Sequence, residues 1–371
     1  MDNQRQPSSD EILPMPSDVK RQAQESAQAS SEPVEPPSAK LIVRLFLIPA
    51  LIVAAAVGVM FLIGLMAGRQ PSMEEALQGL RGRGGQRTTQ YLIGPGSKQR
   101  YLYAKTLADT MKQGLDLSQR LRLTDELIEI LDHHTNAGEG EVRHFLLLAL
   151  GRIWQGEPGD EVAYSDAAAA VAAREKTVEA LIRYAQSPEV EPRKAALLAL
   201  AYLSGHEEAQ RAIPLLVATL NDPKADLDVR LAAATTLGPL ASPNDQRVVD
   251  ALNRAMRVDD ERDAELAWAA ALSLAQLNRA EATDTILKLL DRSELSQLRY
   301  YDRETDPRNP AFRPLNDQEQ QRFLINTMLG AQHLDVPQVN ARLEEIAKED
   351  PSARVRAAAR EILARRASPA S

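Results

Sequence analysis

The stretch DLDVRLAAATTLGPL, residues 226–240, decides the fold of this 371-residue chain, because versions of it recur along the sequence. EVEPRKAALLALAYL at 189–203 lies 37 residues before it, and DAELAWAAALSLAQL at 263–277 lies 37 residues after it. Self-similarity at such a period is typical of repeat architectures. Aligned on the arginine or its equivalent, six copies begin at Glu141, Glu191, Asp228, Glu265, Gln320 and Arg354.

The apolar residues of each copy recur at helical spacing and form one stripe. In the copy at 226–240 the stripe is Val229, Ala232, Ala233, Thr236, Leu237 and Leu240, and in the first copy it is Val142, Phe145, Leu146, Ala149, Leu150 and Ile153. A further helix is predicted before each copy, at 123–132, 177–186, 212–222, 247–256, 283–291 and 339–348. Short turns with Pro and Asp join the two helices. Such a pair covers its apolar face only by stacking on neighbouring pairs, so the sequence predicts an all-α solenoid.

The pattern of Asp or Glu, Val and Arg, followed by x-x-Ala-Ala-x-x-Leu-Gly, resembles HEAT repeats in the short form of phycobilisome-lyase-like HEAT proteins. The best matches are Asp228–Val229–Arg230 with Leu237–Gly238, and Glu141–Val142–Arg143 with Leu150–Gly151. Two copies depart, with Ala267 in place of the arginine and Gln321 in place of the valine. The resemblance covers about residues 118–366 and implies about six helical hairpins. It also implies an interaction scaffold, since few HEAT proteins carry chemistry.

The repeated arginine has two interpretations, a binding face and a structural ladder. The series is Arg143, Arg193, Arg230, Arg322 and Arg356. Resemblance to HEAT units implies that each arginine pairs with an acidic turn residue of its own or an adjacent repeat. We favour this structural ladder, because every interface between neighbouring repeats has to be satisfied.

The residues before the repeats divide into three parts. Residues 1–40 are rich in Pro, Ser, Gln and Glu and poor in large apolar side chains, which predicts a disordered tail. Leu45–Gly68 is 24 residues without a charge, long enough for a transmembrane helix, which we predict over residues 41–68. Its orientation stays open, because Lys and Arg flank both sides almost equally. A linker is predicted at 69–100, the solenoid at 101–367 and a disordered end at 368–371.

The composition excludes several classes of chemistry. The chain has no cysteine, so disulfides, thiolate metal sites and cysteine nucleophiles are excluded. Its net charge of −8 argues against binding to nucleic acid. No phosphate-binding loop, dinucleotide motif or hydrolase motif is present. His133, His134 and His144 lack carboxylates at ligand spacing, and the single His206–Glu207 pair cannot build the di-iron site of the HEAT enzyme deoxyhypusine hydroxylase. No catalytic residue, metal or cofactor is therefore predicted.

The spacing of the copies points to an interaction site. Two intervals are long: 50 residues from Arg143 to Arg193, and 55 from Ala267 to Arg322. The second contains residues 293–320, and insertions into a repeat often lie on the binding face. Aromatic residues and arginine dominate interface hot spots, and this insertion carries Arg299, Tyr300, Tyr301, Arg303, Arg308, Phe312 and Arg313. The alternative is a loop folded back over the adjacent apolar seam, with its aromatics buried.

These observations predict a single-pass membrane protein whose solenoid binds a protein partner at the membrane and has no catalytic activity of its own. Two other functions stay open. The repeat type is similar to that of bilin lyases, which implies a lyase-like or chaperone-like protein. End-to-end stacking of solenoids would instead make a self-assembling component of the cell envelope.

Overall fold

The computed structural model describes residues 71–82, 97–111, 114–136, 138–156, 164–257, 263–302 and 311–367. All of them belong to the unit that begins at Pro71. The predictions for the tail at 1–40, the membrane helix at 41–68 and the end at 368–371 lie outside the described residues. Within the described ranges, every helix is too short or too polar to span a bilayer.

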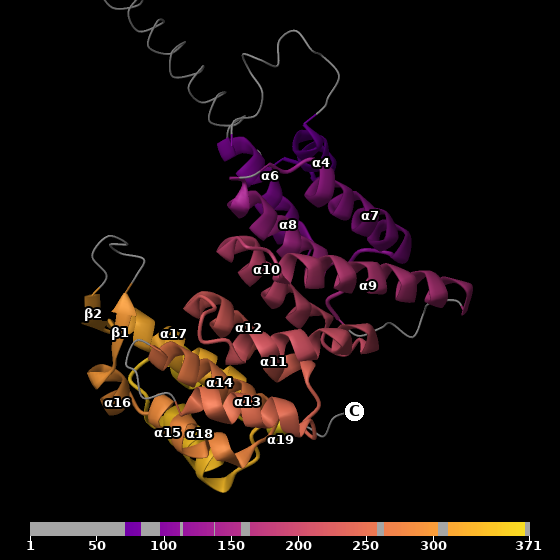
Figure 1. Cartoon of the computed structure of the whole chain (residues 1–371). Coiled ribbons are helices and arrows are strands. Elements are labelled where there is room, and N and C mark those ends of the chain that lie inside the picture. The colour runs from indigo at the N-terminus through magenta and orange to yellow at the C-terminus, as the bar shows by residue number, and fades with distance from the viewer. Residues whose placement is uncertain are drawn as a thin grey trace, which may run out of the picture. The chain divides into compact units, whose positions relative to one another are not determined.

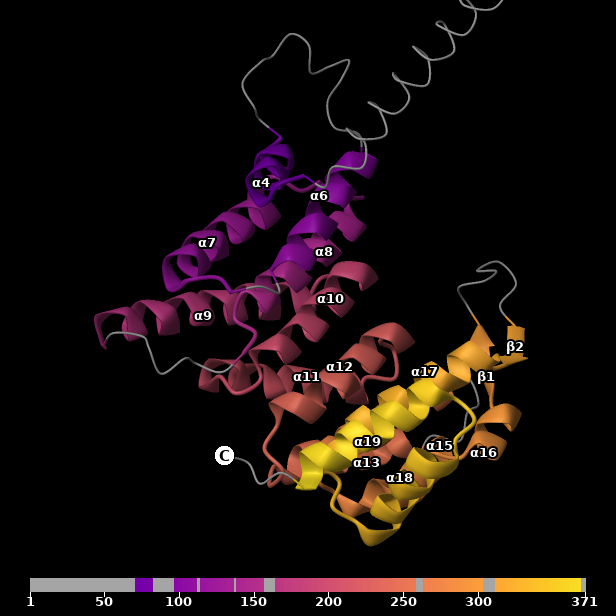
Figure 2. The same cartoon turned by 180° about the vertical axis from the view of Figure 1, so that it is seen from behind.

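The described residues form seven helix pairs stacked in chain order, as Figures 1 and 2 show from opposite sides. The helical repeat fold is therefore confirmed, with one pair more than the six predicted. The pairs are α4 (Met73–Arg81) with α6 (Ser97–Thr110), α7 (Leu117–His133) with α8 (Gly140–Arg152), α9 (Tyr164–Ala185) with α10 (Val190–Leu200), α11 (Ile213–Asn221) with α12 (Leu227–Leu240), α13 (Gln246–Met256) with α14 (Ala264–Gln276), α15 (Thr283–Leu289) with α17 (Asp317–Gly330), and α18 (Pro337–Glu349) with α19 (Ala353–Ala367).

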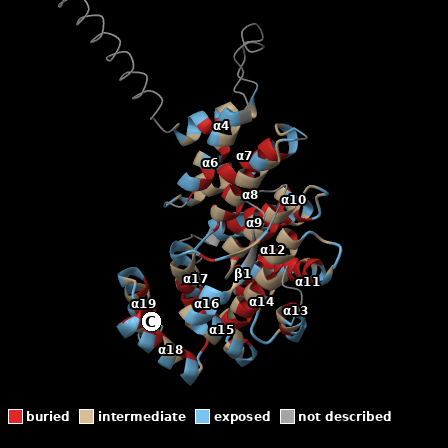
Figure 3. Cartoon of the chain, turned by 90° about the vertical axis from the view of Figure 1, so that its left-hand side faces the viewer, coloured by how far each residue is buried: buried red, intermediate tan, exposed pale blue. Residues whose placement is uncertain are grey.

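Short 3₁₀ turns continue some of these helices. They are η2 (Ala201–Leu203), η3 (Glu207–Ala212), η5 (Ala280–Ala282) and η6 (Ala331–His333). The second helices of successive pairs, α6, α8, α10, α12 and α14, pack directly on one another. Buried residues lie where neighbouring helices face each other, and exposed residues lie outward (Figure 3). The core is thus a continuous seam along the stack, as expected when single pairs cannot cover themselves.

The linker predicted at 69–100 needs correction, because it contains α4 and the start of α6. Ser72 and Glu75 form a capping box at the start of α4, and Ala76, Leu77 and Leu80 are buried against α6. Arg100 on α6 aligns with Arg143 one repeat later and makes the same type of contact, described below. The sequence comparison missed this pair because α4 is short and the stripe of α6 lacks the alanine run.

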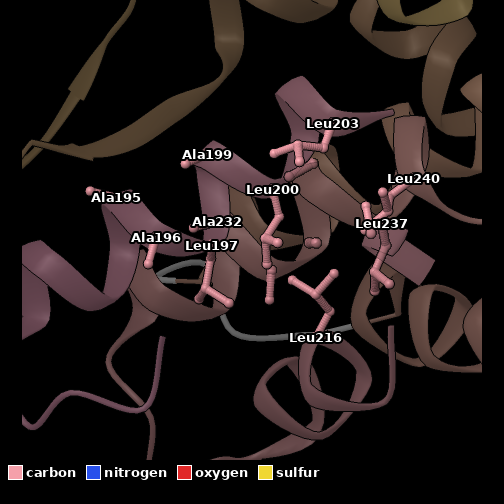
Figure 4. Packing of buried hydrophobic residues seen from close by; sticks show 14 of the residues in the cluster. Ala195, Ala196, Leu197, Ala199, Leu200, Leu203, Leu216, Ala232, Leu237 and Leu240 are labelled. Atoms are coloured by element: carbon pink, nitrogen blue, oxygen red, sulfur yellow. The ribbon is translucent and has the colours of Figure 1, made fainter. Parts of the chain in front are cut away.

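In each described pair, the second helix carries a leucine followed by a small residue. The seven dipeptides are Leu107–Ala108, Leu150–Gly151, Leu200–Ala201, Leu237–Gly238, Leu274–Ala275, Leu329–Gly330 and Leu363–Ala364. The small residue permits close approach of the next second helix. A Cβ on Gly151 would lie 2.5 Å from the Ala199 carbonyl oxygen, and one on Gly238 would lie 2.9 Å from Ser273 Cα. The leucine fills the seam between neighbouring pairs, as Leu200 and Leu237 do in Figure 4.

Buried hydroxyl groups also bridge successive second helices. Thr236 Oγ1 of α12 donates to the Leu197 carbonyl of α10 at 2.9 Å, and Ser273 Oγ of α14 donates to the Ala234 carbonyl of α12 at 2.7 Å. The donor and the acceptor of the second bond each lie 37 residues after those of the first. The polar contacts therefore follow the repeat as the apolar contacts do. Each such bond contributes about 1 kcal/mol to folding.

The regular stacking changes between α14 and α17, on either side of the long interval. Leu329 on α17 is 42% exposed, although the equivalent Leu237 on α12 is fully buried. The α14–α17 contact uses aromatic side chains instead, with Trp268 and Phe323 edge-to-face at 5.2 Å. The motif leucine of α17 therefore lies outside the seam that the leucines of α8, α10, α12 and α14 fill.

Candidate functional site

The insertion at residues 293–320 has secondary structure of its own. It begins with the short helix α16 (Arg292–Gln297), followed by β1 (Arg299–Asp302) and β2 (Ala311–Pro314). The strands pair antiparallel, with Tyr300 opposite Arg313 and Tyr301 opposite Phe312. The hairpin lies at the side of the stack near α17 in Figures 1 and 2. The predicted all-α fold thus carries one short hairpin that the sequence did not predict, where a Pro-rich segment cannot continue a helix.

Both ends of the insertion are fixed to the repeats. Leu295 on α16 and Leu315 after β2 are buried in the core. Arg292 forms a bidentate pair with the buried Asp350 in the turn before α19, at 2.7 and 2.9 Å. Arg313 forms another with Glu319 at 2.8 and 2.7 Å. Bidentate Arg–carboxylate pairs fix orientation as well as distance, so the hairpin has a defined position on the stack.

The predicted partner-binding residues are distributed over both strands. Arg299 is exposed and donates from Nη2 to the Phe312 carbonyl at 3.1 Å. Phe312 and Arg313 are half-buried, which agrees in part with the folded-back alternative. Tyr300 and Tyr301 lie on β1, but their side chains are outside what the structure describes, as are Arg303 and Arg308 entirely.

The arginine series makes a regular contact at three positions. Arg100, Arg143 and Arg230 reach Glu139, Glu189 and Asp263 at 2.6, 2.7 and 3.2 Å. Each acidic residue is the N-cap position of the second helix in the following pair, where a negative charge also favours the helix dipole. These contacts join neighbouring repeats as a structural ladder would.

The other three predicted members of the series lie differently. Arg193 is half-buried, and its Nε is without a hydrogen-bond partner. Arg322 is exposed on α17. Arg356 donates to the Asp350 and Pro351 carbonyls of its own turn at 2.6 and 3.1 Å. The predicted ladder therefore holds at Arg143 and Arg230, and these three members do not take part in it.

The histidines considered as metal ligands occupy separate places. His144 Nδ1 lies 3.2 Å from a carboxylate oxygen of Glu191 on the next second helix, and burial lowers the pKa of His144. His134 lies 3.8 Å from Glu129 at the end of α7. His206 is buried, with Nε2 2.9 Å from the Trp154 carbonyl oxygen. In the described ranges no three His, Asp or Glu side chains gather as they would around a metal ion.

A second candidate site, which the sequence did not predict, lies at the other long interval. Trp154 is buried after α8, and its indole N–H donates to Thr124 Oγ1 at 3.2 Å. The guanidinium groups of Arg120 and Arg174 lie 5.9 and 5.7 Å from its ring centroid. A cavity of about 440 Å³ adjoins this cluster. Its polar residues come from different pairs, so no sequence motif indicates them.

Comparison with known proteins adds little to this geometry. No protein family matches the sequence, and no curated protein is similar to it at a significant level. Among solved structures, the chain is similar to the archaeal HEAT-like repeats protein from Thermococcus onnurineus NA1. The two share 15% identity over 78% of this chain and 86% of that chain, with a TM-score of 0.32. This likeness is weak, and the helical repeat fold follows from the helix pairs themselves.

Proposed function

We propose that this protein is a membrane-anchored repeat scaffold that binds a protein partner through the hairpin surface, defined as Arg299–Asp302 and Ala311–Pro314. The observation that carries the proposal is the fixed hairpin. It is the one pair of strands among the described residues, and two bidentate ion pairs hold the insertion that carries it.

The form of the hairpin suits recognition rather than packing. Arg299, Ala311 and Pro314 are exposed, so part of the surface is free for contact. A rigid binding element loses less conformational entropy when it associates than a mobile loop does. The combination of arginine and aromatic residues in both strands fits the composition of interface hot spots.

The membrane anchor rests on the sequence of Leu45–Gly68 alone. A tether would confine the stack to the membrane surface and raise its effective concentration for partners there. A scaffold needs no catalytic residues, which agrees with a sequence in which no known catalytic motif is present.

A crosslinking pulldown from membranes tests this function. The full chain is compared with a variant carrying Tyr300→Ala, Tyr301→Ala and Arg303→Ala, after both are shown to melt alike. The matched control carries Leu102→Ala and Arg247→Ala, two exposed residues away from the hairpin. We expect the hairpin variant alone to lose its specific partners, by about tenfold or more, since hot-spot truncations exceed 1 kcal/mol.

The outcomes separate the two parts of the proposal. An unchanged partner set in the hairpin variant would exclude this surface as the binding site. Release of the protein by a carbonate wash of the same membranes would contradict the anchor while leaving the scaffold role to be judged by the pulldown.

A further inference from the structure

The cavity beside Trp154 combines charged and apolar walls. It lies where the first three pairs meet, at the ends of α6 and α8 and the start of α7. Arg120, Arg152, Tyr202 and Gln155 supply polar groups, whereas Met111, Leu115 and Ile153 supply apolar ones. Its volume of about 440 Å³ is within the range of small-ligand pockets, about 300–1,000 Å³.

The cations of this region are poorly balanced by carboxylates. Arg174 has a partner, since it donates to Glu208 at 2.8 and 3.0 Å. Arg120 donates Nε to the Leu115 carbonyl at 3.1 Å, and no carboxylate of the described residues lies within ion-pair distance. Burial lowers the pKa of Arg120, with no neighbouring carboxylate to oppose that effect. A half-buried guanidinium without a counter-charge is costly unless an anion joins it.

Arg152 is held in place at the cavity wall. Its Nη1 donates to the Ala108 carbonyl at 2.5 Å, and its Nη2 donates to Tyr202 Oη at 3.1 Å. The guanidinium lies 5.1 Å from the Tyr202 ring centroid, and its nearest carboxylate, on the exposed Asp109, is 4.0 Å away. Arg152 is therefore preorganised, and its charge is only weakly compensated.

We propose that this cavity binds a carboxylate attached to a small apolar body, with Arg120 and Arg152 receiving the carboxylate and Met111, Leu115 and Ile153 the apolar part. This function is separate from the partner binding proposed for the hairpin. The carboxylate comes from a free organic acid or from the C-terminus of a peptide that ends in an apolar residue. Both present the same chemistry to the cavity.

The surroundings favour a single negative charge over a phosphate. The cavity adjoins the C-terminal ends of α6 and α8, where the helix dipoles are negative. Phosphate sites instead use free backbone N–H groups of helix N-termini. At the start of α7, which also borders the cavity, the Asp116 carboxylate already accepts from the Gln119 N–H. The planar guanidinium fork matches a carboxylate, and the apolar walls add contact area that a bare inorganic ion cannot use.

Calorimetry on the full chain in detergent tests the proposal with N-acetyl-leucine and its uncharged amide. We expect the acid to bind and the amide to bind about tenfold more weakly or worse, because hydrogen bonds to charged groups are stronger than neutral ones. Arg120→Gln should weaken binding of the acid by a similar factor. The matched control Arg211→Gln removes an exposed arginine of the neighbouring η3 turn and should leave binding unchanged.

A second pair of probes identifies the source of the carboxylate. A hexapeptide ending in leucine with a free C-terminus should bind at least as well as N-acetyl-leucine if the cavity takes peptide ends, and its exclusion would assign the cavity to free acids. Equal affinity for acid and amide, or tighter binding of inorganic phosphate, overturns the proposal. No binding of any probe to a folded wild-type chain also overturns it, and none of these results bears on the hairpin.

Discussion

The two long intervals of the repeat are similar in length and differ in what the extra residues build. Between Arg143 and Arg193 they extend α9 to 22 residues within the stack. Between Ala267 and Arg322 they form α16 and a hairpin outside the helix pairs. The first interval is accompanied by a charged cavity between pairs, and the second by an exposed motif leucine and a fixed surface element.

Residue composition explains the difference. The segment 167–173, AAAAVAA, consists almost entirely of alanine, the best helix former, so added residues lengthen a helix. The other insertion contains Pro307, Pro310 and Pro314, which helix interiors exclude. Local helix propensity therefore decides whether an insertion of this size lengthens a helix of the stack or forms elements outside the helix pairs. Only the insertion that forms separate elements interrupts the packing of second helices.

The largest expected effect is a difference in stability between substitutions of two motif leucines, Leu237 in the regular packing and Leu329 beside the insertion. Leu237→Ala empties a fully buried site and should lower the free energy of unfolding by about 2–5 kcal/mol. Leu329→Ala changes the equivalent residue of α17, which is 42% exposed, and should cost less than about 0.5 kcal/mol. Urea denaturation of both variants measures the difference. Similar losses for the two would show that Leu329 is buried in solution.

Much of the fold follows from the sequence, because the repeat specifies contacts at every level. The stripe predicted from Val229 to Leu240 is buried throughout. The small residue after each leucine explains the close helix approach, as at Gly238. The first pair was missed since α4 and α6 share only Arg100 and Leu107–Ala108 with the pattern. The exposure of Leu329 was hidden too, because Leu329–Gly330 matches the motif in letters while its environment differs.

The candidate sites were less predictable. The position of the hairpin follows from the broken repeat interval, but its attachment to the stack depends on anchors such as Asp350, which lies in another pair. The cavity depends entirely on stacking. Arg120, Arg152 and Tyr202 are far apart in sequence and belong to two neighbouring pairs. Nothing in the neighbourhood of each residue distinguishes it from an ordinary surface side chain.

An intermediate effect is expected from releasing the hairpin region. Arg292→Ala leaves the buried Asp350 carboxylate without its guanidinium and should cost about 1–3 kcal/mol. The control Arg365→Ala removes an exposed pair with Glu361 and should cost under about 0.5 kcal/mol. Thermal unfolding measures both, and hydrogen exchange at residues 299–302 should increase only in the first variant. Equal exchange in the two would mean that Arg292 does not anchor the hairpin.

The smallest effect expected is a pH dependence at the first interval. His206 is buried, and burial lowers its pKa below 6.5, with Arg174 and Arg120 acting in the same direction and the Trp154 carbonyl and Glu208 opposing them. The ring therefore stays neutral in the folded chain at a pH where the unfolded chain takes up a proton. By linkage, its contribution to stability is complete above the unfolded pKa and declines as pH falls through 6.5 toward the folded pKa.

Urea denaturation at about pH 7 and about pH 5.5 detects this titration, since histidine changes charge in that range. The wild-type chain should be less stable at the lower pH, and His206→Gln should show a smaller decrease. His333→Gln, at an exposed site near the second interval, should retain the wild-type decrease. If both variants lose as much stability at the lower pH as the wild type does, the pH dependence arises from other groups. The two long intervals would then not differ in their response to pH.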